Sequence, residues 1–379
     1  MSLNNGSEGA LSSSPALKVV DFFSGCGGTS AGLRAAGAEI VLGIDRDAGA
    51  RATFKANFPG ATFLEKDVKK LRTAALAPII AAHPDAQWLF SACAPCQPFS
   101  RQRRDKRKND DRAPLLWELI RFVRRYAPSY IFVENVPGLQ SLSQQLGPFD
   151  RFVAALRRLG YAVNSGVVEA RSYGVPQRRG RLVLVASKVG PVSFPPPTHG
   201  PHASAREYST VWEWIGDLPE LAAGEEHFNV PNHKAMDLSA LNLRRIRATP
   251  EGGGRKDWPP DLQLKCHSNG YTGHTDVYGR MRKDQPATGL TTKCLSLSNG
   301  RFGHPTQDRA ISVREAASLQ TFPRSFIFHG TFAAMATQIG NAVPVLLARR
   351  FGEWFVRDLV RNAKPSGLSS GERTEAGNG

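Results

Sequence analysis

Residues 18–36 read KVVDFFSGCGGTSAGLRAA and join a short apolar run to a glycine-rich turn and a helical segment. Residues 18–23 predict a buried strand, residues 24–28 a tight turn, and residues 29–36 a helix that Gly37 ends. A strand, a glycine turn and a helix in this order are typical of the first unit of an α/β sheet.

The same alternation of strands and helices continues along the chain. It predicts an α/β fold with a doubly wound, mostly parallel, Rossmann-like sheet. The further strands are expected over residues 39–44, 61–64, 88–93 and 130–133, with a closing pair at 167–170 and 181–186. The further helices are expected over residues 47–58, 115–126 and 149–159, with regular structure again at 312–319 and an amphipathic helix at 343–359.

The alternation is interrupted between residues 191 and 305, where proline runs, glycine runs and isolated polar residues replace it. Such a segment predicts a second, smaller and irregular lobe. Residues 1–16 and 364–379 have the composition of disordered ends. The expected division therefore places residues 17–190 and 306–363 in one main lobe and residues 191–305 in the second.

Charge is the clearest compositional signal. The 379 residues include 49 Lys or Arg against 33 Asp or Glu, which gives a formal charge of +16 and a pI near 10.0. This favours a polyanionic partner, although charge alone does not distinguish DNA, RNA and an anionic membrane.

No run approaches the ~18 apolar residues of a membrane span, and five irregularly spaced cysteines form no disulfide framework. A cytoplasmic protein that binds no membrane is therefore expected.

The glycine turn predicts a ligand site. Gly25, Gly27 and Gly28 allow a close approach to the backbone, and the following helix start offers free N–H groups to a carboxylate or phosphate. Asp45 stands 20 residues after Gly25, where a doubly wound fold places the acid that binds ribose hydroxyls. Ser30 replaces the third glycine or alanine of the dinucleotide pattern, so an adenosyl ligand with an amino-acid carboxylate fits as well as or better than NAD. A purely structural turn is the alternative.

Cys96 follows the predicted strand 88–93 in a constrained turn and is a candidate nucleophile. Glu134 follows the predicted strand 130–133, about one strand-helix-strand unit further on, so the thiol and the carboxyl are expected at the same sheet edge. A free cysteine is more often a small buried residue, and Cys93 with Cys96 also forms the C-x-x-C pair of redox and zinc sites. The other cysteines are solitary, so no metal is expected.

Residues 101–112 carry seven cations and three anions directly beyond the candidate nucleophile. A charge run is usually a solvated loop, but one in this place could hold a phosphodiester backbone over the site. A second basic cluster, residues 177–181, begins a predicted strand, where Arg179 and Arg181 point to one face. Ordinary surface charge is the alternative for this cluster.

Together these segments resemble the DNA (cytosine-5)-methyltransferases, in particular those of bacterial restriction-modification systems. The likeness covers about residues 17–190 and 305–360. Five short motifs stand in that family's order: DFFSGCGG at 21–28, PCQ at 95–97, ENV at 134–136, QRRGR at 177–181 and QIGNAV at 338–343.

The resemblance implies that the main lobe is catalytic and binds S-adenosylmethionine, and that residues 191–305 form a target-recognition lobe. By this similarity Cys96 would be the nucleophile and Glu134 the acid that contacts a flipped cytosine, with Arg179 and Arg181 completing the pocket. The positions where the family binds the cofactor are Phe23, Ser24, Gly25, Cys26, Gly27, Gly28, Asp45, Arg46, Asp67, Val68, Pro95, Leu115, Asn341 and Ala342. The positions expected at the DNA are Gln97, Ser100, Arg101, Arg103, Arg104 and Arg112.

Two positions depart from the family pattern. Arg46 stands where many members have a residue that packs on adenine, and Ala94 replaces a bulkier residue before the Pro-Cys pair. Base readout would fall to the second lobe, because arginine and lysine read guanine edges. The candidates there are Arg280, Arg282, Lys283 and Arg301.

The implied activity is transfer of a methyl group from S-adenosylmethionine to carbon 5 of cytosine in a specific duplex DNA sequence, through base flipping and a Cys96 adduct. An RNA (tRNA) cytosine-5 methyltransferase of the same fold, a catalytically silent DNA-binding homologue and a nicotinamide oxidoreductase are the alternatives. Double-stranded DNA is the expected partner, which would place a monomeric bacterial protein at the nucleoid. A companion restriction endonuclease would act separately.

Overall fold

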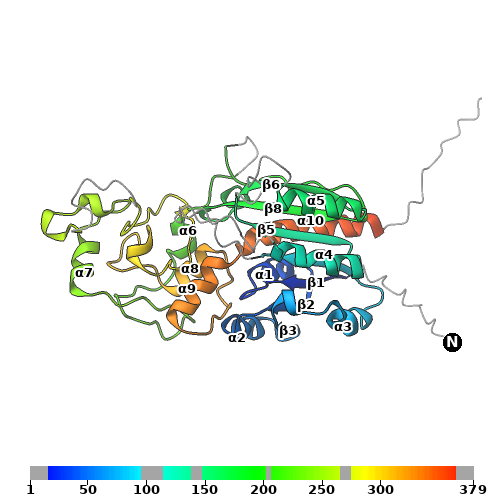
Figure 1. The fold of residues 1–379 in the computed structure, drawn as a ribbon. Coiled ribbons are helices and arrows are strands. Elements are labelled where there is room, and N and C mark those ends of the chain that lie inside the picture. The colour runs from blue at the N-terminus through cyan, green and yellow to red at the C-terminus, as the bar shows by residue number, and fades with distance from the viewer. Residues whose placement is uncertain (1–15, 95–113, 138–146, 202–205, 265–274, 364–379) are drawn as a thin grey trace, which may run out of the picture.

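The fold is built on a seven-stranded sheet with the strand order β3-β2-β1-β4-β5-β8-β6 (Figure 1). It is seen in a computed structural model that describes residues 16–94, 114–137, 147–201, 206–264 and 275–363. Strand β8 is antiparallel to both of its neighbours, and the other adjacent strands are parallel. The predicted doubly wound, mostly parallel sheet is therefore confirmed. Its strands are β1 (Leu17–Phe22), β2 (Glu39–Asp45), β3 (Thr62–Glu65), β4 (Gln87–Ala92), β5 (Tyr130–Asn135), β6 (Ala162–Glu169) and β8 (Gly180–Ser187).

Helices cover both faces of this sheet because successive strand residues point to opposite sides. Phe132 lies on one face and contacts Phe351 at 5.6 Å between ring centroids, whereas its neighbour Val133 belongs to the core of the other face. Helices α1 (Gly28–Ala35) and α10 (Val345–Ala363) pack on the first face. Helices α4 (Pro114–Tyr126) and α5 (Pro148–Arg158) pack on the second.

A close crossing of α1 and α10 joins the two ends of the main lobe. A Cβ at Gly32 would lie 2.4 Å from the Val345 carbonyl oxygen, and one at Gly352 would lie 2.7 Å from the Ala36 side chain. Both positions therefore need glycine for packing. The crossing holds the C-terminal helix against the helix that follows the glycine turn.

Several elements differ from the sequence prediction. Strand β6 begins at Ala162, five residues before the predicted start at 167. Helix α9 (Phe332–Asn341) was not predicted, because its sequence is apolar on most positions and lacks an amphipathic stripe. The remaining helical elements of the main lobe are α2 (Ala48–Asn57), η1 (Val68–Lys70), η2 (Thr73–Leu76), α3 (Ala77–Ala81), η4 (Ala170–Tyr173) and α8 (Val313–Leu319).

The second lobe lies around α7 at the left of the view, and α8 and α9 lie between α7 and the sheet (Figure 1). It contains short elements only, as expected from its proline and glycine content. A two-stranded parallel pair of β7 (Gln177–Arg178) and β9 (Ala287–Thr288) connects it to the main lobe. Its helical elements are α6 (Val211–Ile215), α7 (Ala240–Arg247), η5 (Arg255–Asp257), η6 (Pro260–Leu262) and η8 (Leu297–Asn299). The exact division at 191–305 stays a prediction.

Candidate active site

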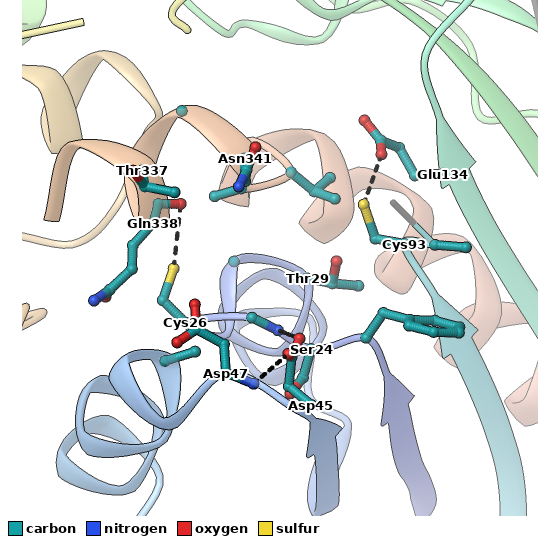
Figure 2. Close-up of a pocket in the computed structure, with 18 of the residues that line it drawn as sticks. Ser24, Cys26, Thr29, Asp45, Asp47, Cys93, Glu134, Thr337, Gln338 and Asn341 are labelled. Carbon is teal, nitrogen blue, oxygen red and sulfur yellow. Dashed lines mark hydrogen bonds between the residues drawn. The ribbon is translucent and has the colours of Figure 1, made fainter. Parts of the chain in front are cut away.

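A cavity of about 550 Å³ lies where β1, β2, β4 and β5 end, beside the start of α1 (Figure 2). Doubly wound sheets bind their ligands at this edge. Glu134, Arg179 and Arg181 line the cavity together with most of the residues expected at the cofactor. Those cofactor positions are Phe23, Ser24, Gly25, Cys26, Gly28, Asp45, Arg46, Asp67, Val68, Leu115, Asn341 and Ala342.

The glycine turn forms one wall of the cavity. Phe23 at φ 57° and Gly25 at φ 52° adopt the left-handed backbone, and the Ser24 carbonyl accepts a hydrogen bond from the Gly27 N–H at 2.9 Å. Gly27 itself, at φ 97°, is not among the lining residues. A Cβ there would lie 2.5 Å from the Phe58 ring, so packing explains this glycine.

Asp45 fixes the shape of this turn. One carboxylate oxygen accepts the Gly25 N–H at 2.8 Å and the other accepts the Asp47 N–H at 3.0 Å. Burial raises the pKa of Asp45, although these backbone donors oppose the shift. A carboxylate has more acceptor sites than these two bonds use, so Asp45 can also accept bonds from a ligand in the cavity.

Arg46 and Asp67 lie at the outer rim. The Arg46 side chain is 76% exposed, and its Nη1 lies 4.0 Å from the Asp67 carboxylate. Arg46 therefore has the freedom to contact a ligand ring, while Asp67 is anchored by accepting the Lys69 N–H at 2.9 Å.

Asp21 is a fully buried carboxyl beneath the glycine turn. It accepts hydrogen bonds from the Ser30 hydroxyl at 2.6 Å and the Ser91 hydroxyl at 2.7 Å, which link β1 to α1 and β4. Burial raises the pKa of Asp21 to about 6, because removal from water disfavours the charged form. The ionised carboxyl is therefore a cost to stability at neutral pH.

Substituting Asp21→Asn is expected to change how stability depends on pH. A carboxyl with a raised folded-state pKa stabilises the fold below its unfolded pKa, and this contribution is lost as the pH rises through about 6. Between pH 5 and pH 7.5, the free energy of unfolding of the wild type should fall by about 1 to 2 kcal/mol relative to the variant. Urea denaturation at both pH values measures this, and parallel pH dependence of the two proteins would contradict it.

Three adjacent strands place polar side chains side by side at the far wall. Ala92 on β4 pairs with Val133 on β5, so the next residues, Cys93 and Glu134, stand next to each other. Glu134 pairs with Val183 on the antiparallel strand β8, which makes Arg181 its diagonal neighbour on the same face. Register therefore brings a thiol, a carboxyl and a guanidinium together.

The Glu134 carboxylate is 3% exposed and only partly satisfied. The Cys93 thiol donates a hydrogen bond to Oε2 at 3.1 Å (Figure 2). Oε1 lies 2.8 Å from the Arg181 Nε, but the two groups are not aligned as a hydrogen bond, and among the described residues Oε1 has no hydrogen-bond partner. The charge of Arg181 offsets part of the cost of burying this oxygen, and a hydrogen-bond donor on a ligand would offset more of it.

Arg179 contributes differently from Arg181. It donates to the Leu290 carbonyl at 2.6 Å and to the Gly340 carbonyl at 2.9 Å, so it ties the second lobe to the end of α9. Burial, followed by repulsion from Arg181, lowers the pKa of Arg179 to about 9, which still leaves it charged at neutral pH. Its Nε is buried and has no hydrogen-bond partner among the described residues. Arg179 therefore supports the wall and retains one donor for a ligand.

Other lining residues were not predicted as site residues. One of them is Gln338, whose carbonyl accepts a hydrogen bond from the predicted residue Cys26 at 3.7 Å (Figure 2). Leu290 follows β9, where no periodic pattern indicated structure. The unpredicted lining residues are Thr29, Asp47, Ala50, Lys66, Cys93, Ala94, Asn135, Val136, Leu290, Thr291, Thr292, Thr337, Gln338, Gly340 and Val343.

Part of the predicted site lies outside the described residues. This applies to the proposed nucleophile Cys96 and to Pro95 beside it. It also applies to every position expected at the DNA: Gln97, Ser100, Arg101, Arg103, Arg104 and Arg112.

Of the four base-reading candidates in the second lobe, Arg280 is a wrong prediction, because its side chain is buried. Arg280 is 5% exposed and donates to the backbone carbonyls of Ile246 and Thr249 at 2.7 and 2.8 Å. Arg301 donates to the Gly252 carbonyl at 2.7 Å. Arg280 is thus a structural residue of the lobe, since buried guanidinium groups must satisfy their donors within the fold. Arg282 is exposed and stays a candidate.

Membrane-spanning helices and metal-ligand clusters are both absent from the described part of the chain. No helix within it is long and apolar enough to cross a membrane. No three His, Cys, Asp or Glu side chains within it are grouped to hold a metal ion.

Comparison with known proteins agrees with this geometry. Residues 17–356 match the model of the family described as C-5 cytosine-specific DNA methylase. The Type II methylase M.HgiDII of Herpetosiphon aurantiacus is 40% identical over 337 residues, which cover 87% of this chain and 92% of the relative. The Type II methyltransferase M1.HphI of Haemophilus parahaemolyticus is 34% identical over 340 residues, covering 89% and 86%.

A solved structure shares the fold. It is described as a candidate DNA modification methyltransferase encoded within a prophage (E. coli), and it superposes with a TM-score of 0.71. The two sequences are 21% identical, and the match covers 91% of this chain and 100% of the other.

Proposed function

Because the chain belongs to the C-5 cytosine-specific DNA methylase family and is a DNA (cytosine-5)-methyltransferase, we propose that it acts through a covalent bond between Cys96 and the target cytosine, with Glu134 and Arg181 holding the base. The observation that carries this proposal is the row of Cys93, Glu134 and Arg181 in the same cavity as the glycine turn. Cys96 stands two residues beyond Ala94, which lines that cavity.

A cysteine suits the first step of this reaction. Carbon 5 of cytosine is a weak nucleophile, so addition of a thiolate to carbon 6 must first convert the ring to an enamine. Cysteine is intrinsically nucleophilic, and nearby cations favour its thiolate. The run at residues 101–112 supplies such cations in the sequence. Loss of the carbon 5 proton at the end of the reaction expels Cys96.

Glu134 suits the charge that develops on the ring. During addition, negative charge builds on ring nitrogen 3, and a positioned carboxyl that shares a proton with this atom relieves it. Oε1 of Glu134 is paired with Arg181 but accepts no hydrogen bond among the described residues, so it can make this contact. Arg181, 2.8 Å from that oxygen, is placed to orient the carboxyl and to donate to the exocyclic oxygen of the base.

The residues of the glycine turn fit S-adenosylmethionine. The Ser24 hydroxyl is buried without a hydrogen-bond partner among the described residues, and the space around Gly25 is open for 4 Å. The free N–H groups at the start of α1 suit the carboxylate of the cofactor, and Asp45 suits its ribose hydroxyls. When bound there, the cofactor supplies the electrophilic methyl group. Phe23, Val68 and Leu115 would contribute apolar contacts with its adenine.

Access to the base requires that the cytosine leave the duplex, at a cost of a few kcal/mol. We assign the phosphate contacts to Gln97, Ser100, Arg101, Arg103, Arg104 and Arg112, and sequence readout to residues 191–305. The match to the C-5 cytosine-specific DNA methylase family and to Type II methylases favours DNA over the RNA alternative. A companion restriction endonuclease and a monomeric state remain part of the proposal.

Bisulfite sequencing tests the proposal directly. DNA from cells that express the protein should retain unconverted cytosines at one short recurrent sequence, because 5-methylcytosine resists conversion. Cells that express the Cys96→Ser variant should show full conversion. Full conversion in both samples would contradict the proposal.

In a chimera that carries residues 191–305 of a relative, the methylated sequence should change, and an unchanged sequence would place readout elsewhere.

A further inference from the structure

The Cys93 thiol donates the one hydrogen bond that the Glu134 carboxylate accepts among the described residues. The Sγ to Oε2 distance is 3.1 Å, and Glu134 is 3% exposed (Figure 2). The other oxygen, Oε1, lies beside Arg181 without an aligned hydrogen bond. The two oxygens of one carboxyl are therefore in different environments: one accepts a hydrogen bond, and the other is in an ion pair with Arg181 without an aligned hydrogen bond.

We propose that Cys93 is a positioning residue for methyl transfer, whose thiol holds Oε2 of Glu134 so that Oε1 is presented to the cytosine. The inference rests on the proposed role of Glu134 and adds the group that sets its orientation. A carboxyl that turns freely about its terminal bond would often tilt its plane away from the base, whereas a fixed donor on one oxygen holds that plane and so the direction of the other oxygen.

The backbone around Cys93 keeps the thiol in place. The Cys93 N–H donates to the Phe22 carbonyl at 3.3 Å, which continues the pairing of β4 with β1 beyond the last strand residue. One residue further, the Asn135 side chain donates to the Ala94 carbonyl at 3.1 Å and ties the end of β5 to the same segment. The segment after β4 that carries Cys93 is thus bonded to β1 on one side and to β5, which carries Glu134, on the other.

The thiol is suited to be a donor and not a second nucleophile. Burial, and then the neighbouring Glu134 charge, raises the pKa of Cys93 well above its ordinary value. The sulfur therefore remains protonated at neutral pH and keeps its hydrogen for Oε2. A thiol is also a weak donor, so the carboxyl can shift slightly when the base enters.

An alternative is that Cys93 only fills space in the wall. In that case a side chain of similar size without a donor would serve as well. The rate of the chemical step distinguishes the two roles. If Cys93 only fills space, its substitution should lower stability or cofactor affinity but leave Glu134 oriented as in the wild type.

Single-turnover methyl transfer with saturating S-adenosylmethionine and duplex DNA tests the inference. Cys93→Ala should lower the rate by about 3- to 10-fold, the effect of losing one hydrogen bond. Cys93→Ser keeps a donor of shorter reach and should recover at least part of that loss. The Kd for S-adenosylmethionine, measured by calorimetry, should stay near the wild-type value for both variants.

Two controls separate positioning from packing. Cys294→Ala removes another buried thiol, one that does not line the cavity, and should leave the rate unchanged whatever it does to the melting temperature. In the background of Glu134→Gln, the Cys93→Ala change should have little further effect, because both act through one carboxyl. Additive losses, or a Cys93→Ala rate equal to the wild type, would overturn the inference. A Glu134→Gln variant with normal activity would instead refute the proposed function itself.

Discussion

Cys96→Ser should abolish methyl transfer, with the single-turnover rate reduced by about 10³-fold or more. A serine hydroxyl is nearly always protonated at neutral pH and is a far weaker nucleophile than a thiolate, so addition to carbon 6 would rarely occur. Most of the residues assigned to S-adenosylmethionine lie on other segments, among them the glycine turn, the end of β2 and the end of α9. Transfer of a labelled methyl group to duplex DNA measures the rate, and calorimetry should show that cofactor binding is retained.

A trapped adduct provides the independent readout for this variant. An oligonucleotide with 5-fluorocytosine at the target position cannot lose its carbon 5 substituent as a proton, so the protein should stay bound to it after methyl transfer. The wild type and the control Cys294→Ala should form this complex, and Cys96→Ser should not. Near-normal turnover by Cys96→Ser, or trapping that survives the substitution, would remove Cys96 from the mechanism.

The sequence was most informative where local chemistry and fold agree. The strand, glycine turn and helix at the start of the main lobe were predictable because glycine is favoured at a left-handed position such as Gly25, and this preference is local. The spacing of Asp45 from that turn follows from the length of one strand-helix-strand unit. Its carboxylate does reach the turn, where it accepts the Gly25 N–H at 2.8 Å.

The contribution of the C-terminal part of the chain was only partly predictable. The QIGNAV motif identified Asn341 and Ala342, but α9, the helix that ends at Asn341, was not predicted from a periodic pattern. Its position depends on distant contacts, such as the bond from the Thr53 hydroxyl to the Gln338 side chain at 2.7 Å. A contact across 285 residues of sequence leaves no local pattern.

Cations were the least predictable feature. Arg280 looks like a base reader in the sequence, yet its guanidinium is buried and donates to four backbone carbonyls and to Asp308. Residue type alone does not distinguish a buried structural arginine from an exposed one. The pairing of Cys93 with Glu134 was missed for a related reason, since strand register decides it and a one-residue shift would separate the two side chains.

Glu134→Gln should slow the chemical step by about 10²-fold or more while leaving the cofactor affinity near the wild-type value. The amide has nearly the shape of the carboxyl but cannot share a proton with ring nitrogen 3. It also conflicts with its neighbours, because Cys93 and Arg181 both lie beside Glu134 as donors. If the amide oxygen accepts from the thiol, the amide nitrogen faces the guanidinium; the reverse orientation leaves the thiol without an acceptor.

Single-turnover kinetics with both substrates saturating isolate this effect from binding. Glu353→Gln is a matched control, because it removes the same charge from an ion pair on α10 with Arg349 and lies outside the cavity. That variant should react at the wild-type rate. A factor of about 10² corresponds to about 2.7 kcal/mol of lost transition-state stabilisation, which is too large for a carboxyl that only packs in the wall. An unchanged rate for Glu134→Gln would therefore show that proton sharing at the ring comes from another group.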